Sequence, residues 1–295
     1  MLDTRTIRRG FALAATAASV LALAACGGGS SRGSASSGGA SSGVYLAAVT
    51  KAADVTGQVP GYKFAISIGS KIASKSVAFS GTGSISERGA QGALEMNVAG
   101  KRISEIIDKP YFYIKVPGGG ERSATHGKPW VRVETSALTA SLGGESLSNS
   151  TADPTQTLGF LKSAGTVTRV GSETVRGAPT TRYHAVIDLE RFAAAAAPAD
   201  RADAKRYAEA FEKVSGSSSL PMDVWIDQQS RVARMAFTLS LCGFGGNRLY
   251  ESLNYELYGY GPQPVLAPPP ASQVTDITAR LKAQVAKGLQ ELSCK

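Results

Sequence analysis

Residues 222–242 read MDVWIDQQSRVARMAFTLSLC, and they decide the fold class. Along Arg231–Cys242 apolar and mixed residues alternate: one side carries Ala233, Met235, Phe237, Leu239 and Leu241, and the other carries Val232, Arg234, Ala236, Thr238 and Ser240. This alternation is typical of a β-strand with one buried face, and Met222–Ile226 before the polar turn predicts its hairpin partner. The stretch therefore predicts an antiparallel sheet with one apolar face and one wet face.

Further short alternating stretches lie on both sides of this hairpin. They are separated by Gly, Ser or Pro, and helical spacing of apolar residues occurs at only a few places. We expect strands at Tyr62–Ile68, Ser76–Ile85, Leu94–Val98, Ile103–Ile107, Tyr111–Val116, Trp130–Val133, Thr166–Val170, Thr180–Leu189 and Leu249–Tyr258. Consecutive strands without regular helical crossovers predict an α+β fold with a large antiparallel sheet.

Four helices are expected between and after these strands. The first covers Tyr45–Val59, and the second runs from Asp153-Pro154, an N-cap with proline at the first helical position, to Gly165. A third lies within the alanine-rich Phe192–Val214, and a fourth follows the Pro-rich residues 261–270. The expected apolar stripes are Ala204, Tyr207, Ala208 and Phe211 in the third and Ile277, Leu281, Val285 and Leu292 in the fourth.

The amino terminus has the pattern of an exported lipoprotein. Three arginines precede an uncharged run from Phe11 to Ala25, as in a secretory signal. As a helix this run would cover about 22 Å, short of the roughly 30 Å of hydrocarbon in a bilayer, so we do not expect it to span the membrane. It ends in Leu23-Ala24-Ala25-Cys26, which resembles a lipobox, so Cys26 is the expected site of lipidation. Arg8-Arg9 leaves the export route, Sec or Tat, open.

These features predict three parts of the chain. Residues 1–25 are the lipoprotein signal peptide, residues 26–43 are the lipidated cysteine with a flexible Gly/Ser tether, and residues 44–295 form a single domain. The tether holds no apolar residue larger than alanine, so it cannot form a core of its own. We therefore expect a monomeric domain at the extracytoplasmic face of the cell membrane, held there by its lipid.

The positive charge of the chain has two interpretations. The formal charge is +9, and +7 remains after the signal segment with its three basic residues and one acidic residue is removed. Nucleic acid is not an expected partner of an exported chain. In the first interpretation, the excess positive charge attracts the domain to anionic lipid headgroups. In the second, it belongs to an ordinary solvated surface, because the basic residues are spread along the chain and not clustered.

Cys242 and Cys294 remain once Cys26 carries lipid. In an oxidising compartment such a pair is expected to join. A bond across about 52 residues would stabilise the fold by roughly 4 kcal/mol in the chain-entropy model. The alternative is two separate buried thiols.

The sequence shows no sign of catalysis. It has two histidines: His126 lies in a Gly/Pro loop, and His184 lies on an expected strand. There is no nucleophile elbow, zinc motif or phosphate loop. Asp223 and Asp227 stand at alternate strand positions, as a hydrolase pair could, but turn and edge carboxylates do the same. We therefore expect no enzyme, no metal and no cofactor.

Several stretches, in order along nearly the whole mature chain, resemble the LppX, LprA, LprF and LprG family of actinobacterial lipoproteins. No single piece is specific, and it is the ordered set that carries the resemblance. The stretches are Gly61–Phe64 (GYKF), Lys128–Val131 (KPWV), Asp153-Pro154 with Leu158 and Leu161, Val170–Gly177 (VGSETVRG), Thr181–His184 (TRYH), Leu220–Asp227 (LPMDVWID), Tyr258-Gly259 and Pro268–Pro270 before Val274.

The resemblance implies a curved antiparallel sheet, a half-barrel similar to the carrier LolA, wrapped around helices. It also implies a hydrophobic cavity for the acyl chains of a lipid or glycolipid, and it offers no catalytic residues. Strand alternation alone selects the candidate cavity-lining residues, which are Val77, Phe79, Leu94, Met96, Val98, Ile114, Met235, Phe237 and Leu239. The chain departs from the family in the Phe192–Val214 insert, the Gly118–Gly127 loop and the Cys242–Cys294 pair, which leaves the ligand class open.

Two functions follow as hypotheses. In the first, the tethered domain binds an acyl chain between sheet and helices and carries or presents it in the envelope. In the second, the same apolar residues form an ordinary solid core, and the domain docks on a partner protein of the envelope. Strand periodicity does not separate the two, because a cavity and a core use the same residue types.

Overall fold

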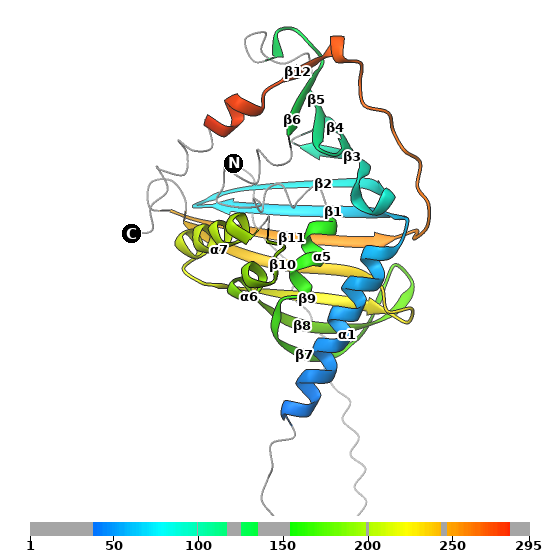
Figure 1. Cartoon of the computed structure of the whole chain (residues 1–295), viewed down its shortest axis with the longest axis vertical. Helices are drawn as coiled ribbons and strands as arrows, with labels where there is room; N and C mark the ends of the chain where they lie inside the picture. The colour runs from blue at the N-terminus through cyan, green and yellow to red at the C-terminus, as the bar shows by residue number, and fades with distance from the viewer. Residues whose placement is uncertain are drawn as a thin grey trace, which may run out of the picture. The chain divides into compact units, whose positions relative to one another are not determined.

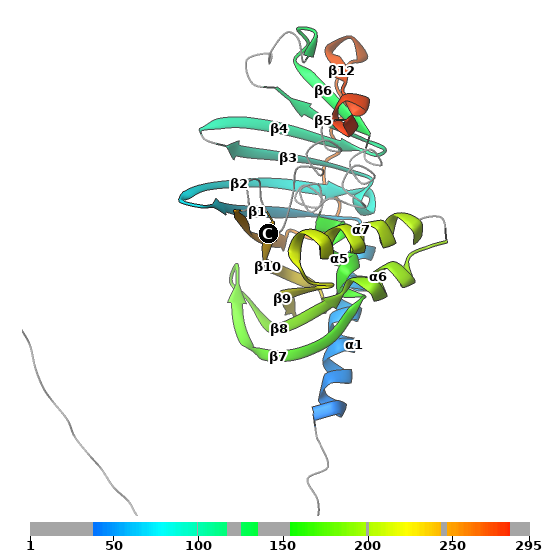
Figure 2. The same cartoon turned by 90° about the vertical axis from the view of Figure 1, so that its left-hand side faces the viewer.

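The computed structural model describes residues 38–98, 100–116, 125–134, 154–198, 201–242 and 247–283. Within these ranges twelve strands form one open, curved sheet in the order β12-β6-β5-β4-β3-β2-β1-β11-β10-β9-β8-β7, with the main helices on one face (Figures 1 and 2). All neighbouring strands are antiparallel except β12 and β6, which are parallel. The predicted α+β fold with a large antiparallel sheet is confirmed.

The expected strands and the first three expected helices are present with shifted ends, the third being divided into α6 and α7. Of the fourth, residues 278–283 are helical, and the rest lies outside the described residues. The first half of the chain contains α1 (Gly38–Gln58), β1 (Gly61–Ile72), β2 (Lys75–Ser86), η1 (Glu87–Gly89), β3 (Gln91–Val98), β4 (Lys101–Asp108), β5 (Tyr111–Lys115) and β6 (Trp130–Glu134). The second half contains α5 (Pro154–Leu161), β7 (Ala164–Val175), β8 (Ala178–Asp188), α6 (Leu189–Ala195), α7 (Arg201–Ser215), β9 (Ser219–Asp227), β10 (Val232–Cys242), β11 (Arg248–Tyr258), η4 (Ala271–Gln273) and β12 (Val274–Asp276).

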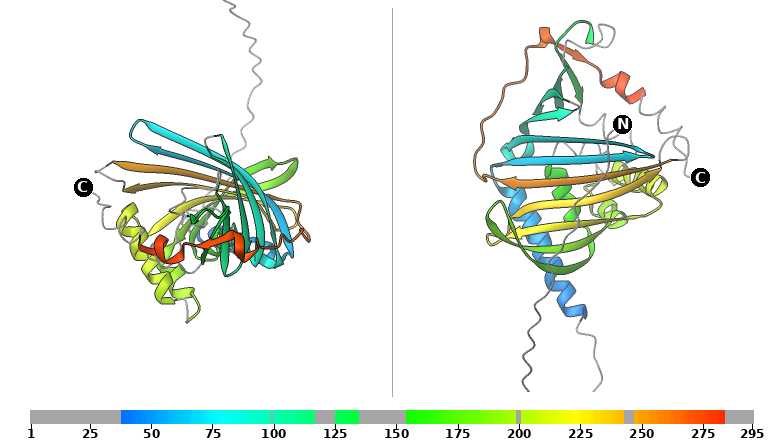
Figure 3. Two further views of the ribbon diagram at one scale, coloured as in Figure 1. Left: turned by 90° about the horizontal axis from the view of Figure 1, so that it is seen from above. Right: turned by 180° about the vertical axis from the view of Figure 1, so that it is seen from behind.

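We call the face of the sheet that carries α1, α5, α6 and α7 the inner face, and the other the outer face. The helices pack mainly on β7 to β10. The principal core combines Val49, Ala52 and Ala53 of α1 with inner-face residues such as Phe64 and Tyr255. The right-hand view of Figure 3 looks onto the outer face, with α1 and α5 behind the strands.

The helical hairpin of α6 and α7 follows from its sequence. Asp188 caps α6 by accepting a hydrogen bond from the backbone N of Arg191 (3.0 Å). The predicted α7 stripe is confirmed, since Ala204, Tyr207, Ala208 and Phe211 are all buried. Tyr207 stacks on Phe160 of α5, with 5.8 Å between ring centroids, so the stripe joins the two helices above the sheet.

Residues 259–276, which we call the strap, run from the end of β11 to one edge of the sheet, where they add a further strand. After β11 the chain follows the strand ends, where the backbone N of Gly261 donates to the carbonyl of Gly61 (2.8 Å), and then adds β12 beside β6 (Figure 1). Lys128 Nζ donates to the carbonyl of Val274 (2.9 Å), and Arg132 pairs with Asp276 (2.9 Å). Strand β12 was not predicted from the sequence, since three residues show no alternation.

Two local predictions were wrong. Gly165 does not end α5, which stops at Leu161, because β7 already begins at Ala164. Ala233 does not share a face with Met235, since a bulge between Val232 and Arg234 shifts the register there. Val232 therefore faces the core, where its backbone N donates to Thr56 Oγ1 (2.8 Å), and Ala233 lies in a small outer cluster.

Other predictions fall wholly or partly outside the described ranges. Those outside are the signal segment with Cys26, residues 27–37 of the tether, Asp153, residues 118–124 of the loop, Val285, Leu292 and Cys294. α1 begins at Gly38, inside the segment predicted as tether. Cys242 is buried at the end of β10, and its bond to Cys294 stays a prediction. No helix in the described ranges is both long enough and apolar enough to cross a membrane.

Gly83 of β2 tests how tightly the inner face is packed. A Cβ there would lie 2.3 Å from the carbonyl oxygen of Ala93 and 2.6 Å from the ring of Phe64, whereas a Cβ at Gly171 of β7 would meet nothing within 4 Å. We expect Gly83→Ala to lower the free energy of unfolding by about 1–3 kcal/mol, because backbone and ring must move apart. Gly171→Ala, the matched control, should stay within about 0.5 kcal/mol. Urea denaturation measures both, and equal effects would contradict this account of the packing.

Candidate ligand-binding surfaces

The helices cover the inner face over β7 to β10 and cover it less completely over β2 to β5. Met235 is 0% exposed, and Phe237, Leu239 and Leu253 are also buried in the principal core. Toward the β1–β2 hairpin tip burial decreases, and Val77 is 49% exposed. We call the half-buried side chains Phe79, Met96, Ile103 and Ile114, together with Val77, the inner patch. The patch continues the apolar inner face onto β2, β3, β4 and β5.

The nine candidate cavity residues therefore divide into groups. Four of them, Leu94, Met235, Phe237 and Leu239, are packed in the principal core, and Phe79 and Met96 pack against it while only partly buried. Val77 and Ile114 lie with Phe79 and Met96 in the inner patch, and the side chain of Val98 lies outside the described part of the chain. That the nine line a cavity stays a prediction.

Two carboxylates stand on the inner face beside the inner patch. Glu105 is paired in register with Leu94 and Ile114, and burial raises its pKa to about 7. Glu251 is paired with Ser70, and burial raises its pKa while a hydrogen bond from Ser70 Oγ (3.3 Å) lowers it. Apolar surface bordered by these polar groups is the usual composition of a small-molecule site.

The outer face carries a stack of charged and aromatic groups. The guanidinium groups of Arg182 and Arg234 lie over the ring of Trp225, at 5.0 and 4.5 Å from its centroid. Trp225 Nε1 donates to Glu173 (2.7 Å), and this bond, followed by that from Arg182, lowers the pKa of Glu173. The stack connects β7, β8, β9 and β10 on the side away from the helices.

His184 and Asp223 lie next to this stack. Asp223 accepts a hydrogen bond from Arg182 Nη2 (2.6 Å) and bonds to His184 Nδ1 (2.8 Å). Burial alone would raise the pKa of Asp223, but the bonds from His184 and Arg182 outweigh it and lower the pKa. Asp227, the other member of the supposed acidic pair, is bound to Arg231 instead (2.7 Å). Each carboxylate is held in its own ion pair.

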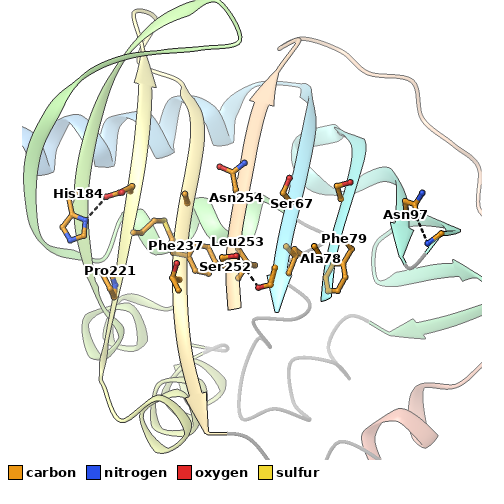
Figure 4. A pocket seen from close by; sticks show the side chains of 18 residues that line it. Ser67, Ala78, Phe79, Asn97, His184, Pro221, Phe237, Ser252, Leu253 and Asn254 are labelled. Atoms are coloured by element: carbon orange, nitrogen blue, oxygen red, sulfur yellow. Dashed lines mark hydrogen bonds and ion pairs between the residues drawn. The ribbon is translucent and has the colours of Figure 1, made fainter. Parts of the chain in front are cut away.

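A groove of about 900 Å³, the outer groove, crosses the strands beside His184 (Figure 4). Its floor follows one row of paired residues from His184 through Asp223, Ala236, Asn254, Ser67 and Ser80 to Asn97. The parallel row of Thr238, Ser252, Gly69 and Ala78 borders it. Small side chains on neighbouring strands leave space along this band.

The outer groove was not predicted from the sequence, although part of its signal was present. Serine, alanine and glycine alternate on the outer side of β1 and β2, at Ser67, Gly69, Ala78 and Ser80. Only the register of seven strands shows that these positions meet. His184 lies on a strand, β8, as expected, and its Nδ1 bonds to Asp223.

The described residues contain no cluster of three or more His, Cys, Asp or Glu side chains that could hold a metal ion. His126 is exposed in the turn before β6, far in sequence from the paired His184. We take the inner patch and the outer groove as the candidate ligand-binding surfaces.

Comparison with known proteins gives distant similarity. No family model matches the chain. An uncharacterized 31.2 kDa protein from the rplA-rplJ intergenic region of Streptomyces griseus is 28% identical over 217 residues, which are 66% of this chain and 67% of that protein. The chain is also similar to LppX and LprF. The LppX crystal structure from Mycobacterium tuberculosis has a TM-score of 0.48 at 14% identity and covers 76% of this chain and 99% of its own.

LprF from Mycobacterium bovis has a TM-score of 0.42 at 14% identity, covering 78% of this chain and 98% of its own. Two of the four names in the family that the sequence stretches resemble, LppX and LprF, thus occur among the similar solved structures.

The Glu105 carboxyl group predicts a pH dependence of stability. Its pKa in the folded protein, about 7, lies above the ordinary value of 4.5. The contribution of Glu105 to the free energy of unfolding is therefore fully present below pH 4.5 and is lost as the pH rises through 7. We expect Glu105→Gln to unfold like the parent at pH 4 and to be more stable at pH 8, by at most about 3 kcal/mol. Urea denaturation at both pH values measures this.

Glu95→Gln is the matched control, because Glu95 is an exposed glutamate on β3, the neighbouring strand. The free energy of unfolding of Glu95→Gln should equal that of the parent at both pH values. A Glu105→Gln variant with the same difference from the parent at pH 4 and pH 8 would show that Glu105 is not the titrating group.

Proposed function

We propose that this protein is a membrane-anchored, exported lipoprotein that binds the acyl chain of a lipid or glycolipid against the inner patch and carries or presents it in the cell envelope. The observation that supports this most is the gradient of burial along the inner face. Helices complete the core over β7 to β10, while an apolar surface of the same kind stays half-buried on β2 to β5. A hydrocarbon guest would complete that second half.

The energetics favour an acyl chain as the guest. Each methylene group removed from water contributes about 0.8 kcal/mol, so a chain of modest length binds without polar recognition. Phe79, Met96 and Ile103 offer the hydrocarbon contacts. At pH values below about 7 a protonated Glu105 can donate a hydrogen bond to an ester or hydroxyl oxygen of the lipid. Catalysis has no part in this proposal.

Anchoring is the second part of the proposal. A lipid on Cys26 and the Gly/Ser tether would hold the domain close to the membrane surface, where a lipid ligand is exchanged. A bond between Cys242 and Cys294 would fix the end of the chain to β10 in the oxidising envelope. The positive net charge would add attraction to anionic headgroups.

A second candidate function is docking on an envelope protein, and the strap favours it. Val265 and Leu266 are about half exposed, in a segment with Pro262, Pro264 and Pro268–Pro270. Extended proline-rich segments are recognised by aromatic-lined grooves of partner proteins. In this function the inner patch would bind no lipid.

Lipid uptake separates the two functions. We expect the purified protein to take up a fluorescent fatty acid and to retain lipid in native mass spectrometry, and we expect Val77→Asp to reduce uptake about tenfold by placing a charge beside the acyl chain. Val77 is already 49% exposed, so the fold should tolerate the change. Ala78→Asp is the matched control, because Ala78 is the next residue, is also exposed and lies on the outer face.

Uptake that is absent in the parent, or equally reduced by both substitutions, would refute the lipid-binding proposal. Circular dichroism of each variant shows that the fold is retained.

Anchoring has its own test. We expect Cys26→Ser to abolish labelling of the protein by radioactive palmitate and to move it from the membrane fraction to the soluble fraction, because the thiol accepts the lipid. Cys242→Ser should keep both the label and the membrane location. Membrane-bound, labelled Cys26→Ser protein would contradict the lipid anchor.

A further inference from the structure

The outer groove lies on the opposite face of the sheet from the inner patch and serves none of the functions above. Most of its lining residues on the outer face have small side chains, and several bear a hydroxyl group: Ser67, Ser80, Thr238 and Ser252. The groove is also lined by residues whose side chains belong to or pack against the core on the inner face: Ile68, Phe79, Met222, Phe237 and Leu253. Figure 4 shows Ser67, Ser252 and Asn254 between His184 at one end of the groove and Asn97 at the other. A volume of about 900 Å³ is in the range of small-molecule sites.

The groove carries almost no net charge. Among its described lining residues there is no Lys or Arg, and the one carboxylate, Asp223, is bound by Arg182 and His184. An anionic ligand, such as a phospholipid headgroup or a polyuronate, would find no cation to pair with in the groove. The electrostatics therefore favour a neutral ligand.

The polar groups of the groove are oriented by the protein itself. Arg234 Nε donates to Asn254 Oδ1 (2.5 Å), and the backbone N of Gly100 donates to Asn97 Oδ1 (3.0 Å). In both residues the oxygen is occupied, so the amide NH₂ group is left to donate to a ligand. Both amides are thus donors with a fixed direction, one at the middle and one at the end of the groove.

His184 complements these donors. Its Nδ1 bonds to Asp223 (2.8 Å), so in the neutral ring Nδ1 carries the proton and Nε2 is an acceptor. Groups that both donate and accept, as hydroxyl groups do, can satisfy His184, the two amides and the serines together. A ligand rich in hydroxyl groups can pair with the amides and hydroxyls of the groove, whereas a ligand of hydrocarbon alone would leave them unpaired.

The position of the groove excludes the usual binding of an extended peptide. Peptides add to a sheet at an edge strand, through unpaired backbone groups. The groove crosses β1, β2, β10 and β11, whose backbone groups are paired on both sides. Recognition here depends on side chains and on shape.

We propose that the outer groove is a binding site for a neutral, hydroxyl-rich saccharide, with His184, Asn254 and Asn97 as its oriented hydrogen-bonding groups. The saccharide could be a segment of an envelope polysaccharide or the sugar headgroup of a glycolipid, which share this chemistry. Binding in the groove is independent of acyl-chain binding, because the sheet separates the two surfaces.

The test uses the full chain and a set of neutral oligosaccharides of four to eight sugars: a glucan, a mannan, a galactan and an arabinan. A polyuronate of the same length serves as the charged comparison, and calorimetry measures binding. We expect at least one neutral oligosaccharide to bind with a dissociation constant below about 10 mM, and the polyuronate to bind about tenfold more weakly or not at all.

Variants then locate the site. Ala78→Trp fills the groove and His184→Ala removes the acceptor, and each should weaken binding about tenfold or more. Two controls should bind within about twofold of the parent: Ala47→Trp, at an exposed alanine of α1, and Val77→Asp, in the inner patch. Thermal denaturation confirms that each variant is folded.

Three results would overturn the proposal: no neutral oligosaccharide binds, the polyuronate binds as tightly as the neutral ones, or Ala78→Trp binds like the parent. An alkyl glycoside and its free sugar distinguish the two sources. Similar affinity for both supports a polysaccharide segment, and tighter binding of the glycoside that Ala78→Trp still weakens supports a headgroup. Binding of the glycoside alone, lost in Val77→Asp and kept in Ala78→Trp, would assign the ligand to the inner patch and refute a saccharide site.

Discussion

The side-chain alternation of the central strands β10, β11 and β1 is the constraint on which the other features depend. A strand paired on both sides can place its side chains on two faces only, and a register shift of one residue exchanges them. On these strands the inner positions bury Met235, Tyr255 and Phe64 under the helices, and the outer positions, including Asn254 and Ser67, form the floor of the groove. The same register therefore determines the core and the composition of the opposite surface.

The alternation of single strands was sufficient to predict the antiparallel sheet, because the period of two is local to each strand. What could not be predicted depends on neighbours. The bulge before Arg234 turns Ala233 to the outer face, and β12 is held by Arg132 and Lys128, more than a hundred residues earlier in the chain. The alternation of side chains along each strand likewise selected the inner residues. It could not show that Phe237 is packed under helices while Val77 is half exposed, because which strands the helices cover is a property of the tertiary structure.

The two faces are stabilised by different means. The inner face depends on hydrophobic burial, which is complete around Met235 and incomplete at the inner patch. The outer face depends on ion pairs and cation–π contacts around Trp225, and these also orient Asp223 and Asn254. A substitution on one face can thus alter that surface while the other face retains its packing, so paired variants such as those at Val77 and Ala78 report on one face at a time.

The strap also matters for how copies of the chain meet each other. A terminal strand with unpaired backbone groups can pair with another molecule, and β12 occupies that place beside β6. Among the described strands, β7 is the terminal strand on the other side. Its register is interrupted near Gly171, and it carries Arg169 and Glu173, devices that hinder intermolecular strand pairing even though Val170 is half exposed. Copies of the chain are therefore hindered from pairing with one another through the β7 edge.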